Sequence, residues 1–455
     1  MMRSHTPRKL AWAVAATVLW TAAPAAGEDA LSIPVQRSTL GNGLRIVLSP
    51  DTSAPVVAVA VYYDVGSRNE VRGRSGFAHL FEHMMFEGSA NVGKNEHTRL
   101  INAAGGSDNG STSSDRTNYY EGLPSNQLAL GLWLEADRMR ALAITDENFE
   151  NQRSVVINEY HQSYENRPYG LAGIRINALS FGDYFPYANP TIGSVQDLES
   201  GTLEDARSFW ESWYGPNNAV LVIVGDFDPA EALRLAEEHF GDIPSRPRPD
   251  WVDPGFPGQS EERTEVMYDR LAPLPAFYMT YHIPPMRHPD HYALEMLGII
   301  MGYGESSRIY RSLVEEQQVC TYAYAYTDGR RGPDLINFEG YLATGHQPDE
   351  ARRLVDQEIE RVRADLVTER ELTRARNRVR SYFISQLQTA MDRAQELAEF
   401  ELYYGDARLM LTEMERYLAV TREQVREVAN RYLITTGRSV LDVLPGEPPT
   451  DGGRP

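Results

Sequence analysis

The sequence predicts an α+β protein of two homologous domains, each a mainly antiparallel mixed sheet flanked by helices, which face each other across a cavity. Three observations predict this fold class. The 455 residues are 42% hydrophobic and 24% charged, as in a globular chain of two or three domains. Short runs rich in β-branched and aromatic residues alternate with helical stretches. A strand-like run at 54–61 recurs at 274–281, an offset of 220 residues that indicates an internal duplication.

The first 25 residues are predicted to be a signal peptide. Arg8 and Lys9 give a positive start, residues 10–20 form an apolar run, and Ala23-Pro24-Ala25 offers small residues for cleavage. This run is too short to cross a bilayer, which takes about 20 apolar residues. We therefore expect a periplasmic or secreted protein with no membrane span.

The net charge and the cysteine content exclude several function classes. With 64 acidic and 44 basic residues, the formal charge is −20, the wrong sign for a protein that binds a nucleic-acid duplex or a membrane surface. Cys320 is the single cysteine, so the chain forms no internal disulfide. Its apolar and aromatic neighbours indicate a buried side chain rather than a nucleophile.

Turn residues and apolar patterns predict the elements in chain order. Asn42-Gly43 lies between apolar residues at 40–48, which is the strongest short signal for a β-hairpin. Pro229 predicts the start of a helix that runs to about His239. Further apolar patterns predict strands at 55–63 and 219–224 and a helix at 77–86.

A proline-rich stretch is the predicted linker between the two halves. It carries five prolines between Gly241 and Gln259. Helix starts also repeat, since Thr145 and Thr368 lie 223 positions apart and each precedes acidic residues in a capping-box pattern. The predicted divisions are a first domain at 31–240, the linker at 241–260, a second domain at 261–445 and a disordered tail at 446–455.

The segment His79-Leu80-Phe81-Glu82-His83 is the candidate metal-binding and catalytic motif. Residues four positions apart lie on one face of a helix, so both imidazoles reach one metal ion. Glu82 projects over the same face, where it can act on a water molecule without being a ligand. A solvated helix face is the alternative, but the apolar neighbours indicate a buried segment, in which His and Glu need partners. This inverted spacing is a known zinc-protease signature.

The motif resembles that of the pitrilysin/insulysin family of inverted-motif zinc peptidases, and more closely its bacterial subfamily similar to the mitochondrial processing peptidase. The resemblance covers nearly the whole mature chain and includes Gly76-Phe77-Ala78 before the motif. It implies that Glu159, which lies 76 residues after His83, is the third zinc ligand. Taken alone, Glu159 would be interpreted as an exposed helical acid. That interpretation is kept for its neighbours Glu147, Glu150 and Glu165.

The same resemblance implies a substrate-binding strand. In relatives, the stretch that corresponds to 105–120 looks like an edge strand on which a peptide is added as a further β-strand. Without the resemblance, this stretch would be interpreted as a polar hairpin loop followed by an ordinary strand. The residues implied to bind substrate are Asn109, Gly110, Ser111 and Thr112, with Asn109 touching the substrate backbone.

The activity that the resemblance implies is that of a zinc endopeptidase acting on short or unfolded peptides. Zinc held by His79, His83 and Glu159 would lower the pKa of a bound water from about 15.7 toward about 7. Glu82 would take the water's proton and return it to the leaving amine. The duplication places the counterpart of the motif at 298–301, where no ligand residue stands, so we expect one metal site per chain.

The second half departs from the family pattern. Active single-chain relatives carry an Arg followed seven residues later by a Tyr, and Arg308 and Arg311 lie too early to match it, although a bent helix could present one of them. This departure favours a homologous partner subunit, in a heterodimer or a homodimer, that donates the missing pair. Two alignments remain open: the family's Arg and Tyr positions correspond either to Val314 and Thr321 or to Glu315 and Tyr322.

A second hypothesis follows from the missing Arg. The chain would then be a non-catalytic or peptide-capturing subunit of the same fold. Gln152 is a further departure, since many relatives have Glu at this position and its loss can weaken metal binding. The intact set of His79, Glu82, His83 and Glu159 favours the peptidase.

Overall fold

Two β-sheets with surrounding helices make up the part of the chain that the computed structural model describes, residues 33–249 and 251–448. The predicted signal peptide lies outside the described residues, as do residues 449–455 of the predicted tail. Within the described ranges, no helix combines the length and the apolar character needed to cross a bilayer. Residues 241–249 and 251–262 contain no helix or strand, and the domain boundaries stay a prediction.

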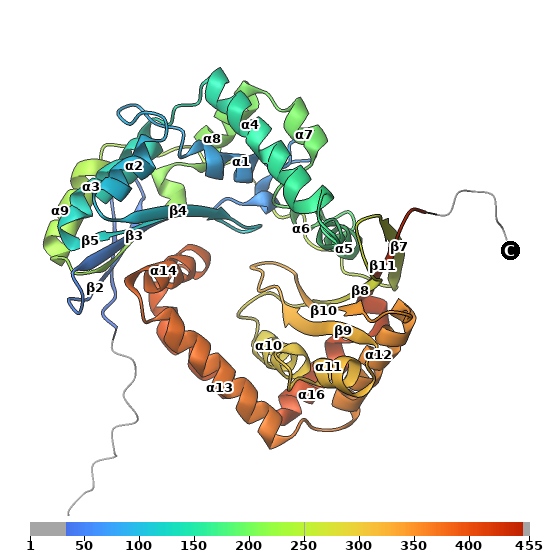
Figure 1. The fold of residues 1–455 in the computed structure, drawn as a ribbon. Helices are drawn as coiled ribbons and strands as arrows, with labels where there is room; N and C mark the ends of the chain where they lie inside the picture. The colour runs from blue at the N-terminus through green and yellow to red at the C-terminus, as the bar shows by residue number, and fades with distance from the viewer. Residues whose placement is uncertain (1–32, 250, 449–455) are drawn as a thin grey trace, which may run out of the picture. The chain divides into compact units, whose positions relative to one another are not determined.

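The first sheet contains the strands β1 (Gln36–Thr39), β2 (Arg45–Pro50), β3 (Val56–Tyr63), β4 (Ser107–Thr112), β5 (Thr117–Pro124) and β6 (Ala219–Gly225). Their order across the sheet is β1-β2-β6-β3-β5-β4, and β2, β3, β4 and β5 are labelled in Figure 1. The hairpin at Asn42-Gly43 is confirmed, because β1 and β2 pair antiparallel across a turn in which Gly43 has φ 91°. β2 and β6 are parallel neighbours, and the other neighbours are antiparallel.

The second sheet contains the strands β7 (Arg263–Asp269), β8 (Ala276–Ile283), β9 (Cys320–Thr327), β10 (Asp334–Leu342) and β11 (Arg438–Pro445). Their order is β7-β11-β8-β10-β9, with β7 and β11 parallel and the other neighbours antiparallel. β3 and β8 begin 220 residues apart and hold the same place in their sheets. Two similar, mainly antiparallel mixed sheets are therefore confirmed, whereas a cavity between them stays a prediction.

Helices flank both sheets, and their starts follow the expected capping residues. Thr145 caps its helix by accepting a hydrogen bond from the Asn148 N–H, and Thr368 forms a full capping box with Glu371. The helices described in the first half are α1 (Phe77–Met84), α2 (Glu96–Ala103), α3 (Leu128–Arg140), α4 (Asp146–Tyr160), α5 (Ala172–Phe181), α6 (Phe185–Ala188), α7 (Val195–Ser200), α8 (Leu203–Trp213) and α9 (Pro229–Phe240). Those in the second half are α10 (Pro289–Gly302), α11 (Arg308–Tyr310), α12 (Pro348–Ala364), α13 (Glu369–Gln386), α14 (Ala390–Tyr404), α15 (Met410–Leu418) and α16 (Arg422–Tyr432).

Each half of the sequence lends a helix to the sheet of the other half. α5 packs on β7, β8 and β11 of the second sheet, and α14 packs on β2, β3, β5 and β6 of the first (Figure 1). Glu401 of α14 is 1% exposed and accepts hydrogen bonds from Nε and Nη2 of Arg37, both at 2.7 Å. This exchange explains why both faces of β3 and β6 are buried.

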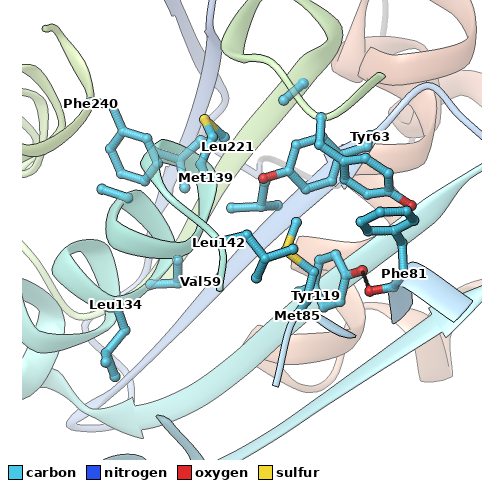
Figure 2. Packing of buried hydrophobic residues seen from close by; sticks show 14 of the residues in the cluster. Val59, Tyr63, Phe81, Met85, Tyr119, Leu134, Met139, Leu142, Leu221 and Phe240 are labelled. Atoms are coloured by element: carbon cyan, nitrogen blue, oxygen red, sulfur yellow. Dashed lines mark hydrogen bonds between the residues drawn. The ribbon is translucent and has the colours of Figure 1, made fainter. Parts of the chain in front are cut away.

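The core of the first half lies on the sheet face opposite α14. Val59, Tyr63, Phe81, Tyr119 and Leu221 are each 0% exposed and come from β3, α1, β5 and β6 (Figure 2). The Tyr119 hydroxyl donates a hydrogen bond to the Phe81 carbonyl oxygen at 3.0 Å, drawn as the dashed line in Figure 2. The core therefore fixes α1, which carries the metal motif, against the central strands.

Candidate metal centre

Buried contacts fix where α1 begins. Gly76 precedes the helix with φ 89°, and a Cβ there would lie 2.8 Å from the Ile192 carbonyl oxygen, so this position requires glycine. The Glu70 carboxylate accepts hydrogen bonds from the backbone N–H groups of Gly76 and Ala78 at 2.9 and 2.8 Å. It thereby pairs N–H groups that the start of a helix leaves without partners. Burial raises the pKa of the Glu70 carboxyl to about 8.

His79 and His83 of α1 and Glu159 of α4 converge on one point. Oε2 of Glu159 lies 3.9 Å from Nε2 of His79 and 3.4 Å from Nε2 of His83. One donor atom from each of the three residues lies within 4.8 Å of the others. Their side chains are 13%, 24% and 39% exposed, so solvent reaches the point where they meet. The fold therefore brings together residues that lie 76 positions apart in the sequence.

The donor set fits a catalytic zinc ion. Two imidazole nitrogens and one carboxylate oxygen are a protein ligand set of zinc hydrolases, which leave a fourth position for water. Tetrahedral bonds of about 2.1 Å put donor atoms about 3.4 Å apart, close to the spacing in this group. Burial, with a smaller contribution from His83, lowers the pKa of His79 to about 4. The His79 imidazole is therefore neutral at pH 7, as a metal ligand must be.

Glu82 lies on α1 next to His83 and is not one of the three converging residues. Burial raises the pKa of its carboxyl, and the Glu159 carboxylate acts in the same direction. The Thr112 hydroxyl and the positive charge of Arg116 act in the opposite direction. α1 contacts β4, and the Thr112 hydroxyl of that strand acts on the Glu82 carboxyl, so Glu82 lies near the predicted substrate strand. A carboxyl in this environment is suited to taking up and releasing a proton.

The predicted substrate residues lie on β4, at the end of the strand order. Asn109 pairs with Tyr120 of β5 and Gly110 with Tyr119, and the described sheet has no strand on the other side of β4. Asn109 is exposed, whereas a Cβ at Gly110 would lie 3.1 Å from the Tyr119 ring. Arg116 donates a hydrogen bond to the Ser111 carbonyl oxygen at 2.9 Å. The edge position that the added-strand hypothesis requires is therefore present.

Among the described residues, Gln152 makes no hydrogen bond to the converging group. It is 7% exposed, and its Nε2 donates a hydrogen bond to Oε1 of Glu87 at 2.6 Å, while Glu87 also pairs with Lys94 at 2.8 Å. This contact holds α4 to the segment that follows α1. The competing acids near Glu159 are exposed and lie outside the group: Glu147, Glu150 and Glu165.

Arg308 and Arg311, the two arginines considered for the family's Arg position, each form an ion pair with an acidic side chain. Nε of Arg308 lies 2.7 Å from Oε1 of Glu371 on α13. Arg311 pairs with Glu316 at 3.1 Å. Tyr322 lies on the edge strand β9 and is 46% exposed. The Val314 and Glu315 positions belong to a π-helical turn, η5 (Arg311–Glu316).

No sequence pattern predicts two further features of this region. Glu70 lies outside any regular pattern, and its role depends on a loop that returns to the start of α1. A second group of metal-type donors, His97, Glu121 and Glu135, comes from three different elements without regular spacing. A tertiary contact of this kind becomes visible only in the fold.

Two protein-family models match the chain. The model described as insulinase (peptidase family M16) matches residues 45–175, which contain the three converging residues. The model described as peptidase M16 inactive domain matches residues 200–379. Together they span both sheets except for the terminal strands β1 and β11.

Curated relatives and solved structures give the same result. Zinc protease PqqE of Helicobacter pylori is 28% identical over 90% of this chain and 92% of its own length. A probable mitochondrial-processing peptidase subunit beta of Arabidopsis thaliana is 25% identical over 89% of this chain and 77% of its own length. The crystal structure of a protease from Helicobacter pylori, 27% identical, covers 91% of this chain and 100% of its own with a TM-score of 0.85. The chain therefore belongs to the insulinase family of peptidases, peptidase family M16.

Proposed function

We propose that the chain is a zinc-dependent endopeptidase that hydrolyses short or unfolded peptides. The observation that carries this proposal is the convergence of His79, His83 and Glu159, with Glu82 on the same helix as the two histidines. Relatives named zinc proteases, matched over 90% and 89% of the chain, support it. The three converging side chains are partly exposed, so a water molecule can reach them, as hydrolysis requires.

The residues take separate roles in peptide hydrolysis. His79, His83 and Glu159 would hold zinc, which would act as a Lewis acid and lower the pKa of a bound water from about 15.7 toward about 7. Glu82 accepts the proton of the attacking water at a carboxylate oxygen and donates it to the nitrogen of the leaving amine. The hydrogen bonds that the Gly76 and Ala78 N–H groups donate to Glu70 hold the start of α1 and thereby keep both imidazoles in position.

The substrate is proposed to lie along β4 as an added strand. Backbone pairing gives affinity with little regard to side chains, and only an extended segment can make it. The exposed position of Asn109 at the edge of the sheet supports contact with the substrate backbone. Short or unfolded peptides meet this requirement, whereas folded proteins do not.

We further propose that a homologous partner subunit donates the Arg and Tyr, in a heterodimer or a homodimer. Arg308 and Arg311 are engaged by Glu371 and Glu316, which supports an outside donor. A relative is named as a subunit of a processing peptidase. We also propose that the chain is exported to the periplasm or secreted, on the basis of residues 1–25.

The test measures zinc content and cleavage of a quenched-fluorescence peptide library, with the chain alone and with any partner that co-purifies. Glu82→Gln should lose at least about 100-fold in cleavage while zinc stays, because only the proton acceptor is removed. His79→Ala should lose about one zinc per chain together with cleavage. Glu150→Gln changes an exposed acid of α4 and should leave both readouts unchanged.

Two outcomes would contradict the proposal. Full cleavage by Glu82→Gln would remove the role assigned to Glu82. Zinc binding by the wild type without cleavage, with and without a partner, would favour a peptide-capturing subunit.

A further inference from the structure

A second group of metal-type donors is buried beneath the edge of the first sheet. His97 belongs to α2, Glu121 to β5 and Glu135 to α3, and they are 3%, 0% and 0% exposed. One donor atom from each residue lies within 4.8 Å of the others. The group shares no residue with His79, His83 and Glu159.

Several atoms of this group have no hydrogen-bond partner among the described residues. They are Nε2 of His97 and both carboxylate oxygens of Glu121. Glu135, by contrast, is paired with Arg138, whose Nε donates to Oε2 at 2.9 Å. Leaving buried polar groups unpaired costs free energy, and buried polar atoms in native proteins nearly always have a partner. Nη1 of Arg138 is unpaired as well, but this one nitrogen cannot satisfy both Glu121 oxygens and Nε2 of His97, so a further partner is indicated beyond the described side chains.

The charges of the group favour a cation. Asp108 adds a third carboxylate, with Oδ2 at 4.0 Å from Nε2 of His97 and a side chain that is 4% exposed. Arg138 is the one cationic side chain paired with these carboxylates in the described chain. With a neutral His97, three carboxylates and one guanidinium leave a net charge of minus two inside the core. A net charge of this size is costly in a buried site, and one divalent cation neutralises it.

We propose that His97, Glu121 and Glu135 bind a second divalent cation, a zinc-class ion with a structural role. An imidazole nitrogen with two carboxylate oxygens is typical of first-row transition metals, whereas calcium and magnesium prefer oxygen ligands alone. This site adds to the one metal site that the sequence predicts.

Local packing leaves room for the Glu121 carboxylate at this position. A Cβ at Gly131 of α3 would lie 3.0 Å from Oε1 of Glu121 and 2.9 Å from Cδ1 of Leu123, so glycine leaves space for both side chains. Bound there, the cation would tie α2, β5 and α3 together beneath β4. It would therefore stabilise the strand that is proposed to hold the substrate, without touching the substrate.

The rival occupant is a proton. Burial and the Glu135 carboxylate raise the pKa of Glu121 well above its usual value, so a neutral Glu121 sharing its proton with Glu135 would also relieve the repulsion. Such a proton would leave Nε2 of His97 without a partner, and it would remove only one of the two excess negative charges. The metal accounts for both observations.

The test measures bound metal in the full-length chain after the first site is disabled. His79→Ala/His83→Ala is purified in the presence of zinc, desalted and analysed by elemental mass spectrometry. We expect about one zinc per chain to remain. Adding Glu121→Gln, which keeps the side-chain shape, should remove it, whereas adding the exposed control Glu211→Gln should not.

A second measurement starts from the wild type. Wild-type protein loaded with cobalt should bind about two ions per chain, and Glu121→Gln should bind about one. A wild type with one ion, together with a metal-free His79→Ala/His83→Ala variant that is folded by circular dichroism, would overturn the proposal in favour of the shared proton. Cleavage by the wild type tests the proposed function separately.

Discussion

Glu70 shows how one buried side chain outside the motif controls its geometry. Its carboxylate accepts hydrogen bonds from the Gly76 and Ala78 N–H groups and, at 2.7 Å, from Nδ2 of Asn189. Glu70→Ala would leave the two backbone N–H groups unpaired in a buried place and leave Nδ2 of Asn189 with only its 3.3 Å hydrogen bond to the Ser67 carbonyl oxygen. We expect the free energy of unfolding to fall by about 2–4 kcal/mol, since each lost partner costs about 1–3 kcal/mol before relaxation. Chemical denaturation of the wild type and the variant measures this.

The position of α1 gives the prediction a second readout. Because the hydrogen bonds to Glu70 set where α1 begins, the variant should also bind zinc more weakly at His79 and His83. Glu211→Ala, which removes an exposed helical acid, should change neither stability nor zinc affinity. A Glu70→Ala protein with wild-type stability would show that Glu70 does not fix the helix.

At the same scale, the residues differ in how far the sequence predicts them. His79, Glu82 and His83 are predictable because their spacing of one helical turn is local. Glu159 required the family resemblance, since no local pattern separates a ligand from an exposed helical acid. Glu70 and His97 were not predictable, because their partners come from loops and strands that meet them only after folding.

At the scale of the element, β4 has one edge without a neighbouring strand in the described sheet and one edge that is paired with β5. Its pairing with β5 and the hydrogen bond from Arg116 to the Ser111 carbonyl oxygen fix its course. Asn109 is exposed and its side chain donates no hydrogen bond elsewhere in the described chain; its Oδ1 accepts one from the adjacent Gly110 N–H at 2.9 Å. Changing Asn109 should therefore affect the substrate more than the fold.

We expect Asn109→Ala to raise KM about 5- to 10-fold with little change in kcat. One lost hydrogen bond to a peptide backbone costs about 1–1.5 kcal/mol, and uniform binding loss appears in KM. Steady-state kinetics with a single peptide substrate measures both constants, and Ser107→Ala on the same strand is the control. A fall in kcat by a similar factor would instead indicate that Asn109 contacts the reacting atoms.

Element bounds were predicted better than element environments. The patterns at 55–63 and 219–224 predicted β3 and β6 within one residue at each end. They did not indicate that α14, which lies far along the chain, covers the second face of both strands. Continuous apolar runs are typical of strands buried on two faces, but the covering helix cannot be identified from such a run.

At the scale of the whole molecule, the exchanged helices make the two halves depend on each other. Side chains of β3 alternate between the core of the first half and the face that α14 covers. Ala58, Ala60 and Tyr62 lie outside that core cluster, and they are 1%, 0% and 2% exposed. Val222 of β6 also lies outside that core cluster and is 0% exposed. Without α14, this apolar face would meet water.

We therefore expect residues 31–249 expressed alone to aggregate or to bind the dye ANS strongly, because a contiguous apolar patch is exposed. Co-expression with residues 250–455 should restore a soluble complex, since α14 returns to the sheet. Size-exclusion chromatography and dye fluorescence measure both outcomes, and the full chain is the reference. In the full chain, Glu401→Ala should lower the free energy of unfolding by about 2–3 kcal/mol, because it leaves the Arg37 guanidinium without its carboxylate. A first half that is monomeric, dye-free and as stable as the full chain would mean that the exchanged helix contributes little, and the halves would then fold as independent domains.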